Sequence, residues 1–183
     1  SLMFDFLFIV KWYFFGRLKI GRKSRKKIAF IEFNRALSNL NKGSYVIDCG
    51  ANVGEFTKLF LEKGFIVDAF EPDPIAINEL KKNLKNYKNL NLFQSAVGLK
   101  DNTQKLFRYR KFDKNDPYST QGSSLLDYRS GTNKPFVEIK VIDFINHINK
   151  QKKEISLLKM DIEGSEIEIL NKIIDFNIHD KIK

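Results

Sequence analysis

The sequence predicts an α/β fold in which a mostly parallel sheet carries helices on both faces. Short apolar runs alternate with segments of helical spacing across residues 45–174, as they do in chains of strand–helix–strand units. The first run leads directly into a glycine-punctuated turn, and two later runs, 65–70 and 155–160, are each followed by acidic residues. Open α/β sheets bind their ligands at such strand ends. With 183 residues, the chain has the length of one domain with one substantial core.

Each element has a local signal. In chain order we expect a helix within 28–40, a strand over 45–49, a helix over 55–63, a strand over 65–70, a helix from residue 74, strands over 91–96 and 136–141, a helix over 143–149, a strand over 155–160 and a last helix after residue 166. Gly64 is typical of a helix stop, and Asp73 followed by Pro74 is typical of a helix start. The last helix is expected to bury one apolar face, formed by Ile167, Leu170, Ile173 and Ile174.

The turn after the first strand predicts a nucleoside site. Residues 45–54 read Tyr-Val-Ile-Asp-Cys-Gly-Ala-Asn-Val-Gly, and Glu71 ends the next strand about twenty residues later, where a ribose needs an acceptor. A dinucleotide fingerprint requires a bare glycine where Asn52 stands, and Asp48 would repel a diphosphate. A cationic, phosphate-free nucleoside such as S-adenosylmethionine fits better. The alternative is a structural strand–turn–helix that binds no ligand.

A third group of acids follows the strand at 155–160. Asp161, Glu163 and Glu166 stand at its carboxyl end, directly before the last helix. A carboxylate in this position is a candidate general base for a hydroxyl nucleophile. The alternatives are a divalent metal held by the three acids, and, for Glu163 and Glu166, a favourable interaction with the positive end of the following helix.

Together these motifs resemble the FkbM family of S-adenosylmethionine-dependent methyltransferases. The resemblance covers about residues 45–170 and is carried by Asp48-x-Gly50-Ala51-Asn52-x-Gly54, Glu71-Pro72, Ser95-Ala96-Val97-Gly98, Val141-Ile142-Asp143-Phe144 and Lys159-Met160-Asp161-Ile162-Glu163-Gly164-Ser165-Glu166. It implies a Rossmann-like methyltransferase fold and methyl transfer, usually to an oxygen of a sugar, lipid or secondary metabolite.

Strand-end positions and the family pattern together assign the site residues. Asp48 is expected to orient the turn and hold the methionine ammonium, directly or through water, and Glu71 to accept the ribose hydroxyls. The turn residues, expected to lie against the methionine portion, are Gly50, Ala51, Asn52 and Gly54; Ser95 and Ala96 are expected to bracket the adenine. Asp161 is the first candidate for general base and Glu163 the second. We expect no metal site built from Cys and His, and His147 and His179 are expected at the surface.

Charge and aromatic residues concentrate at the N-terminus, which we treat as a segment (1–40) preceding the domain (41–183). The net charge is +10, and residues 1–31 hold eight Lys or Arg residues against one acid, so the remainder carries only +3. The apolar stretch 2–15 is shorter than the about 20 residues that span a membrane. Its aromatic residues, followed by cations, favour a peripheral membrane contact through residues 2–27, with helix packing on the sheet or self-association as alternatives. The single cysteine, Cys49, cannot form a disulfide within the chain, which fits a cytoplasmic location. With the membrane contact, this would be the inner face of the membrane.

Three expectations remain open at this stage. The polar stretch 99–135 is either a lid or substrate-reading element beside the site, or a surface excursion. An RNA methyltransferase is the alternative suggested by the basic composition, although a nucleic-acid enzyme more often spreads its cations around the pocket. A non-catalytic, membrane-associated module that retains the pocket is the other. The chain also ends about where a fifth strand is expected, so the sheet is predicted to lack its later strands.

Overall fold

The structure is a computed structural model of the chain, and it describes residues 31, 33–108, 111–121, 123–125, 135–162 and 165–182. Its elements are β1 (Tyr45–Cys49), α3 (Glu55–Glu62), β2 (Ile66–Phe70), α4 (Pro74–Leu84), β3 (Leu90–Phe93), β4 (Ala96–Gly98), β5 (Asn102–Phe107), the 3-10 helix η1 (Pro117–Thr120), β6 (Phe136–Asp143), α5 (Phe144–Lys150), β7 (Ile155–Met160), α6 (Glu166–Asp175) and the 3-10 helix η2 (Ile178–Lys181). Residues 33–38 are also helical. The predicted N-terminal membrane segment, 2–27, lies outside the described residues.

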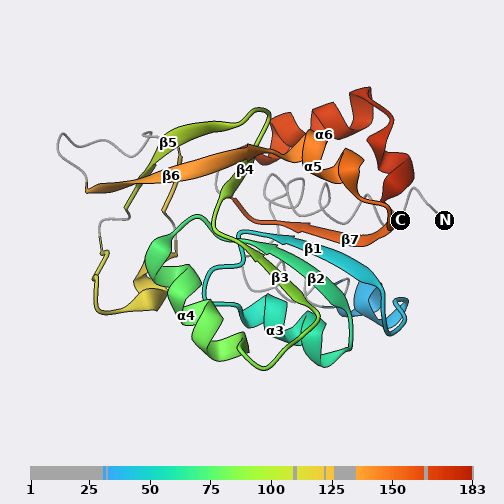
Figure 1. The fold of residues 1–183 in the computed structure, drawn as a ribbon, viewed down its shortest axis with the longest axis horizontal. Coiled ribbons are helices and arrows are strands. Elements are labelled where there is room, and N and C mark those ends of the chain that lie inside the picture. Colours follow the sequence, from blue (N-terminus) through green and yellow to red (C-terminus); the bar gives the residue numbers. More distant parts are fainter. Residues whose placement is uncertain are drawn as a thin grey trace.

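The centre of the fold is a four-stranded parallel sheet in the order β3-β2-β1-β7. A smaller sheet, β4-β6-β5, stands beside it, with β4 parallel and β5 antiparallel to β6 (Figure 1). On the outer side of β7, Ile182 forms an isolated parallel bridge with Ile155, the position expected for the next strand. The mixed α/β architecture with a parallel central sheet confirms the predicted fold class.

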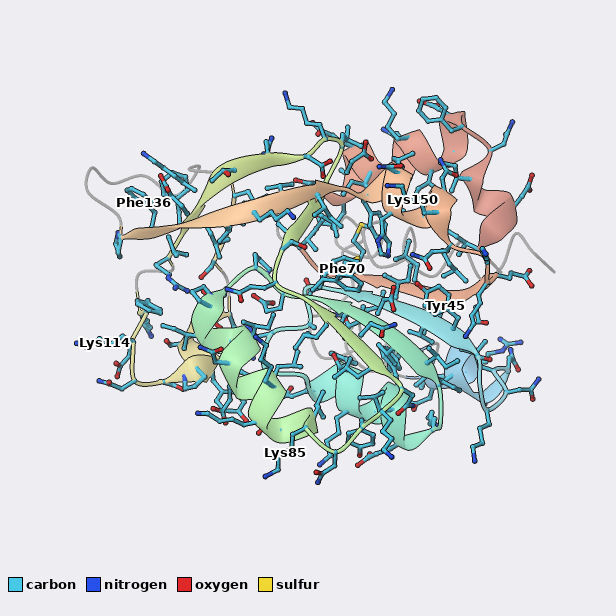
Figure 2. All side chains as sticks on the ribbon, in the orientation of Figure 1. Tyr45, Phe70, Lys85, Lys114, Phe136 and Lys150 are labelled. Atoms are coloured by element: carbon cyan, nitrogen blue, oxygen red, sulfur yellow. The ribbon has the colours of Figure 1, made fainter. Side chains whose placement is uncertain are left out.

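Helices cover both faces of the central sheet (Figure 1). Because successive strand residues point to opposite faces, β1 contributes to two cores. Tyr45, Ile47 and Cys49 pack with the buried side chains of α5 and α6, whereas Val46 packs with those of α3 and α4. Figure 2 shows the side chains that fill the space between these layers, with Phe70 near the middle of the molecule.

Several local predictions are confirmed. Asp73 caps α4, since its Oδ1 accepts hydrogen bonds from the backbone N–H groups of Ile75 and Ala76, and Pro74 is the first helical residue. Gly64 follows α3 with a φ of +79°, a conformation that favours glycine. The helix expected within 28–40 is present over 33–38; of its predicted apolar face, Phe33 and Leu37 are buried, whereas Ile31 is exposed. These elements were predictable because their signals are local.

Three local predictions are wrong. The third predicted strand is two: β3 ends at Phe93, and β4 begins at Ala96 in the other sheet. In the polar stretch the residues 106–109 predict a short strand, whereas the structure has β5, a strand of six residues that begins at Asn102. In α6 the buried residues are Ile169, Leu170 and Ile173, while Ile167 and Ile174 are exposed. The spacing of the apolar residues in α6 is compatible with two different buried faces. Packing against α5 buries the face that contains Ile169, Leu170 and Ile173.

No helix among the described residues is long and apolar enough to cross a membrane.

Candidate active site at the carboxyl ends of the strands

The register of the central sheet places three motif positions at one edge. Cys49 in β1 is paired with Phe70 in β2 and with Met160 in β7, so the three strands end at the same level. The residues that follow are therefore neighbours across the sheet: Gly50, Glu71 and Asp161. Backbone hydrogen bonds continue past the strand ends, from Gly50 N to Phe70 O and from Asp161 N to Cys49 O, each 2.9 Å long.

A cavity of about 420 Å³ opens at this edge. This volume is within the range of small-molecule sites. The predicted site residues that line it are Gly50, Ala51, Asn52, Glu71, Ser95, Ala96 and Asp161. Asp48 and Gly54 do not line it, and Glu163 lies outside the described residues. The strand ends therefore bring most of the predicted residues around one space.

The glycines of the turn are explained by contacts within the protein. Gly50 has a φ of +80°, and a Cβ built on it would lie 2.0 Å from the backbone oxygen of Asp161. Gly54 has a φ of +92°, and a Cβ there would lie 3.0 Å from side-chain carbons of Leu80 and Leu84. Between them Asn52 has a φ of +50°, which asparagine tolerates better than most residues. The turn fits closely against the β7 and α4 segments, which fixes the wall of the cavity.

Glu71 has the environment of a functional carboxylate. It is 6% exposed, its Oε2 accepts a hydrogen bond from Asn52 N, and its Oε1 accepts one from Asp73 N, both 2.8 Å long. Burial raises the pKa of Glu71 to about 7, and the Asn52 hydrogen bond and the positive charges of Lys159 and Arg108 only partly oppose this. A carboxylate has about four acceptor positions, so two remain for a ligand in the cavity.

Asp48 is buried behind the turn and does not line the cavity, so it has no direct access to an ammonium group bound there. Its side chain is fully buried; Thr57 donates a hydrogen bond of 2.7 Å to Oδ2, and Lys159 Nζ lies 3.0 Å from Oδ1. Lys159 also donates to Gly50 O at 2.9 Å, and it lines the cavity. Burial opposes the charge of Lys159, but Asp48 and Asp161 outweigh it and raise its pKa. Asp48 therefore acts on the turn through Lys159.

Asp161 stands where the sequence predicts a base. Asp161 is exposed and lines the cavity beside Ile162. Glu166 accepts a hydrogen bond of 3.0 Å from Ile162 N, so it stabilises the connection between β7 and α6, in line with the helix-terminal alternative for this acid. Among the described residues, no three His, Cys, Asp or Glu side chains are arranged to hold a metal ion.

The polar stretch 99–135, which we call the insertion, contributes to the cavity. The insertion residues that line it are Leu106, Thr120, Gln121, Ser123 and Leu125. Thr120 Oγ1 accepts a hydrogen bond of 2.8 Å from the side chain of Asn52. Arg108, at the end of β5, forms a buried ion pair with Asp73. The surface-excursion alternative is therefore wrong for these segments.

A second polar cluster lies away from the cavity, under α5. Asp68 accepts hydrogen bonds from Tyr45 (2.6 Å) and Asn91 (2.8 Å), and its Oδ2 lies 3.3 Å from His147 Nε2. Burial opposes the charge of Asp68, but the hydrogen bonds from His147, Tyr45 and Asn91 outweigh it and lower its pKa. The side chain of His147 is 15% exposed and packs against Phe70, so the predicted surface position is wrong for this histidine.

Sequence reasoning missed Lys159, Arg108 and Thr120. Lys159 is the first residue of the motif 159–166. Its position beside the predicted acidic strand end was the signal that could have identified it as a site residue. The partners of Arg108 and Thr120 are distant in the chain, and neither residue belongs to a motif.

Comparisons with known proteins give one family. The model of the methyltransferase FkbM domain matches residues 48–181, which include every predicted site residue. A curated relative, Methyltransferase 1 from Beauveria bassiana (strain ARSEF 2860), is 26% identical over 149 residues. The match covers 72% of this chain and 59% of that protein, so the chain spans about three fifths of the length of that relative.

Proposed function

The chain belongs to the FkbM methyltransferase family, and from this premise we propose that it is an S-adenosylmethionine-dependent O-methyltransferase acting on a hydroxyl of a sugar, lipid or secondary metabolite. The observation that carries the cofactor proposal is Glu71. It is a buried carboxylate at the end of β2, held beside the glycine turn, and it lines a cavity of about 420 Å³ together with Asp161.

The residues around the cavity fit S-adenosylmethionine. The free acceptor positions of Glu71 suit the two ribose hydroxyls, and Ser95 and Ala96 lie on the cavity wall where the predicted adenine contact is needed. Three acids besides Glu71 line the cavity, namely Glu55, Asp73 and Asp161, with Lys159 as the one cation among the described lining residues. Asp73 and Lys159 are neutralised by their ion pairs with Arg108 and Asp48. The remaining negative charge favours a cationic ligand.

The mechanism requires positioning and the removal of one proton. Bound S-adenosylmethionine supplies a methyl group that is already activated by the sulfonium. The protein then has to hold the acceptor oxygen on the line of the carbon–sulfur bond that breaks. Asp161 is our candidate for the base that takes the hydroxyl proton as the new carbon–oxygen bond forms. Glu163 remains a second candidate from the sequence.

The acceptor and the membrane contact are proposals of the same kind. The family resemblance supports a hydroxyl acceptor, and the uncharged insertion residues on the cavity wall, Thr120, Gln121 and Ser123, are compatible with a hydroxylated one. We propose that the aromatic and basic segment 2–27 holds the protein at an anionic membrane surface, at the cytoplasmic face. A lipid or glycolipid acceptor would then lie in the same membrane surface that the protein binds.

Calorimetric titration with S-adenosylhomocysteine, the stable product of the methyl donor, tests the cofactor proposal. We expect one site on the wild type and a loss of affinity of at least tenfold in Glu71→Ala, since two charge-assisted hydrogen bonds are removed. Glu62→Gln is the matched control, because Glu62 is exposed on α3 and pairs only loosely with Lys58 at 3.8 Å. A folded wild type that binds neither this product nor the donor would overturn the proposal.

The role of Asp161 is tested separately from binding. Asp161→Asn should bind S-adenosylhomocysteine with nearly the wild-type affinity, yet lose methyl transfer to a pool of candidate acceptors by about 100-fold or more, as expected for removal of a general base. A variant that keeps wild-type turnover would exclude Asp161 as the base.

A further inference from the structure

Glu71 is held by two peptide groups, and each of these is itself held by the insertion. The N–H groups of Asn52 and Asp73 donate to the two oxygens of Glu71. The side chain of Asn52 donates to Thr120, and the side chain of Asp73 is paired with Arg108. Thr120 and Arg108 thus lie behind the two groups that orient the carboxylate.

The contact through Asp73 is made by a buried arginine that also stacks on an aromatic ring. Asp73 is 1% exposed, and its Oδ1 is already used to cap α4, which leaves Oδ2 for Arg108. The Arg108 side chain is 6% exposed, and its guanidinium lies 4.3 Å from the ring centroid of Phe112. Its backbone N–H donates to Pro135 O at 2.9 Å, which continues the pairing of β5 with β6. A planar cation that both stacks and pairs is held in one orientation.

The contact through Asn52 reaches the turn itself. Thr120 is 4% exposed; its hydroxyl donates to Pro117 O at 2.7 Å and accepts from Asn52 Nδ2 at 2.8 Å. The bond to Pro117 O lies within η1 and fixes the hydroxyl proton, which leaves a lone pair directed at Asn52. The η1 segment packs against α4 (Figure 1). Asn52 has a positive φ that few residues adopt, so a side-chain anchor helps to keep the turn in this conformation.

From these two contacts we propose that Arg108 and Thr120 are positioning residues of the cofactor site: the insertion holds Glu71 in its ribose-binding orientation through Asp73 and Asn52. The inference rests on the proposed function, because it assumes that Glu71 accepts the ribose hydroxyls. It assigns to the insertion a part in binding the methyl donor, in addition to any contact with the acceptor. Arg108 also supplies a positive charge that favours the ionised form of Glu71, and its effect is therefore electrostatic as well as geometric.

The experiment is calorimetric titration of the whole chain with S-adenosylhomocysteine between pH 5.5 and 8.5. Binding to the wild type should strengthen as Glu71 ionises, with a midpoint near pH 7. In Arg108→Gln we expect weaker binding at pH 7 by about tenfold and a midpoint moved to higher pH, because a cation that favours the carboxylate is gone. Arg108→Lys should return the midpoint toward the wild-type value while binding stays weakened, since the ammonium cannot reproduce the stacked, planar contact.

Two further variants keep the test decisive. Thr120→Val preserves shape and should fold; it loses the hydrogen bond from Asn52 and the one to Pro117 O, and its dissociation constant should rise about fivefold with the midpoint unchanged. Arg35→Gln removes the same charge from an exposed position on the helix before the sheet and should match the wild type in both quantities. A merely structural role of Arg108 would lower the unfolding temperature without moving the pH midpoint.

The outcomes separate the two proposals. If the wild type binds, but Thr120→Val and folded Arg108→Gln match it in affinity and midpoint, the positioning role is refuted and the proposed function stands. Should Arg108→Gln fail to fold, wild-type affinity in Thr120→Val refutes the role and a fivefold loss supports it. If the wild type itself does not bind S-adenosylhomocysteine, the proposed function fails and this inference fails with it.

Discussion

The free energy of unfolding of the ligand-free protein should fall as the pH rises from 5 to 8. Most of this fall should be due to Glu71, so it should be much smaller in a Glu71→Gln variant. Glu71 has a pKa of about 7 in the folded protein against an ordinary value of 4.5. The folded state therefore binds its proton more tightly than the unfolded state does. Stability contributed by the protonated form is complete below about pH 4.5 and is lost as the pH rises to 7.

The magnitude follows from these two values. Each tenfold change in proton affinity corresponds to about 1.4 kcal/mol, so the full effect is roughly 3–4 kcal/mol. Because part of the change has already occurred at pH 5, we expect about 2–3 kcal/mol between pH 5 and pH 8. This is a large fraction of the about 5–15 kcal/mol that is typical of a whole domain.

Urea unfolding at several pH values measures the effect. At pH 8, Glu71→Gln is expected to be destabilised by about 1–3 kcal/mol, because its amide NH₂ group faces one of the two backbone N–H groups whose hydrogen bonds the carboxylate accepted. Between pH 5 and pH 8 its stability should change by about 2–3 kcal/mol less than that of the wild type. Glu62→Gln, on the exposed face of α3, should keep the wild-type slope. Equal slopes in the wild type and in Glu71→Gln would refute the assignment of a raised pKa to this carboxylate.

Three further predictions concern the turn, the buried ion pair and the N-terminal segment. Gly50→Ala should lower stability by more than about 2 kcal/mol in urea unfolding, since its Cβ meets the Asp161 oxygen at 2.0 Å and its φ is +80°; stability within 0.5 kcal/mol of the wild type would contradict the close approach. Lys159→Met leaves Asp48 buried without its cation and should cost about 3–5 kcal/mol, and adding Asp48→Asn should recover part of that loss; additive losses in this double-mutant cycle would show that the pair is not coupled. Replacing the Lys and Arg residues of 22–27 by Gln should reduce flotation with anionic vesicles at low salt, while neutral vesicles bind neither form; unchanged flotation would refute the membrane contact.

The strand ends were predictable because their signals are local and share one geometry. The apolar run before Gly50, the acid after β2 and the Asp73 cap can each be read within a few residues. Parallel strands of similar length place the following residues at the same edge, and the register that pairs Cys49 with Phe70 and Met160 confirms this. These positions required no knowledge of contacts between distant segments.

The remaining features depend on contacts between segments that are distant in the chain. The break between β3 and β4 at Ser95 follows from a change of sheet, which no property of residues 91–96 reports. The exposure of Ile167 follows from the way α6 packs against its neighbours. Likewise Lys159 meets Asp48, and Arg108 meets Asp73, only after the sheet has formed. A charged residue in a strand or loop carries no local sign of its partner.

The charges around the cavity lead to a last prediction. Asp48 and Asp73 are matched by Lys159 and Arg108, whereas no ion pair involves Glu71 among the described residues. Its carboxylate is the one that a bound ribose, with a sulfonium nearby, would stabilise in the ionised form. Binding of S-adenosylmethionine should therefore lower the pKa of Glu71 from about 7 and release a proton near pH 6.5, where the free protein still holds one in most molecules. Titrations in buffers of different ionisation enthalpy measure that proton: the apparent binding enthalpy should depend on the buffer at pH 6.5, should not depend on it through Glu71 at pH 9, and should lose the pH 6.5 dependence in Glu71→Gln. A wild type whose binding enthalpy at pH 6.5 is the same in every buffer would show that the ligand does not engage this carboxylate.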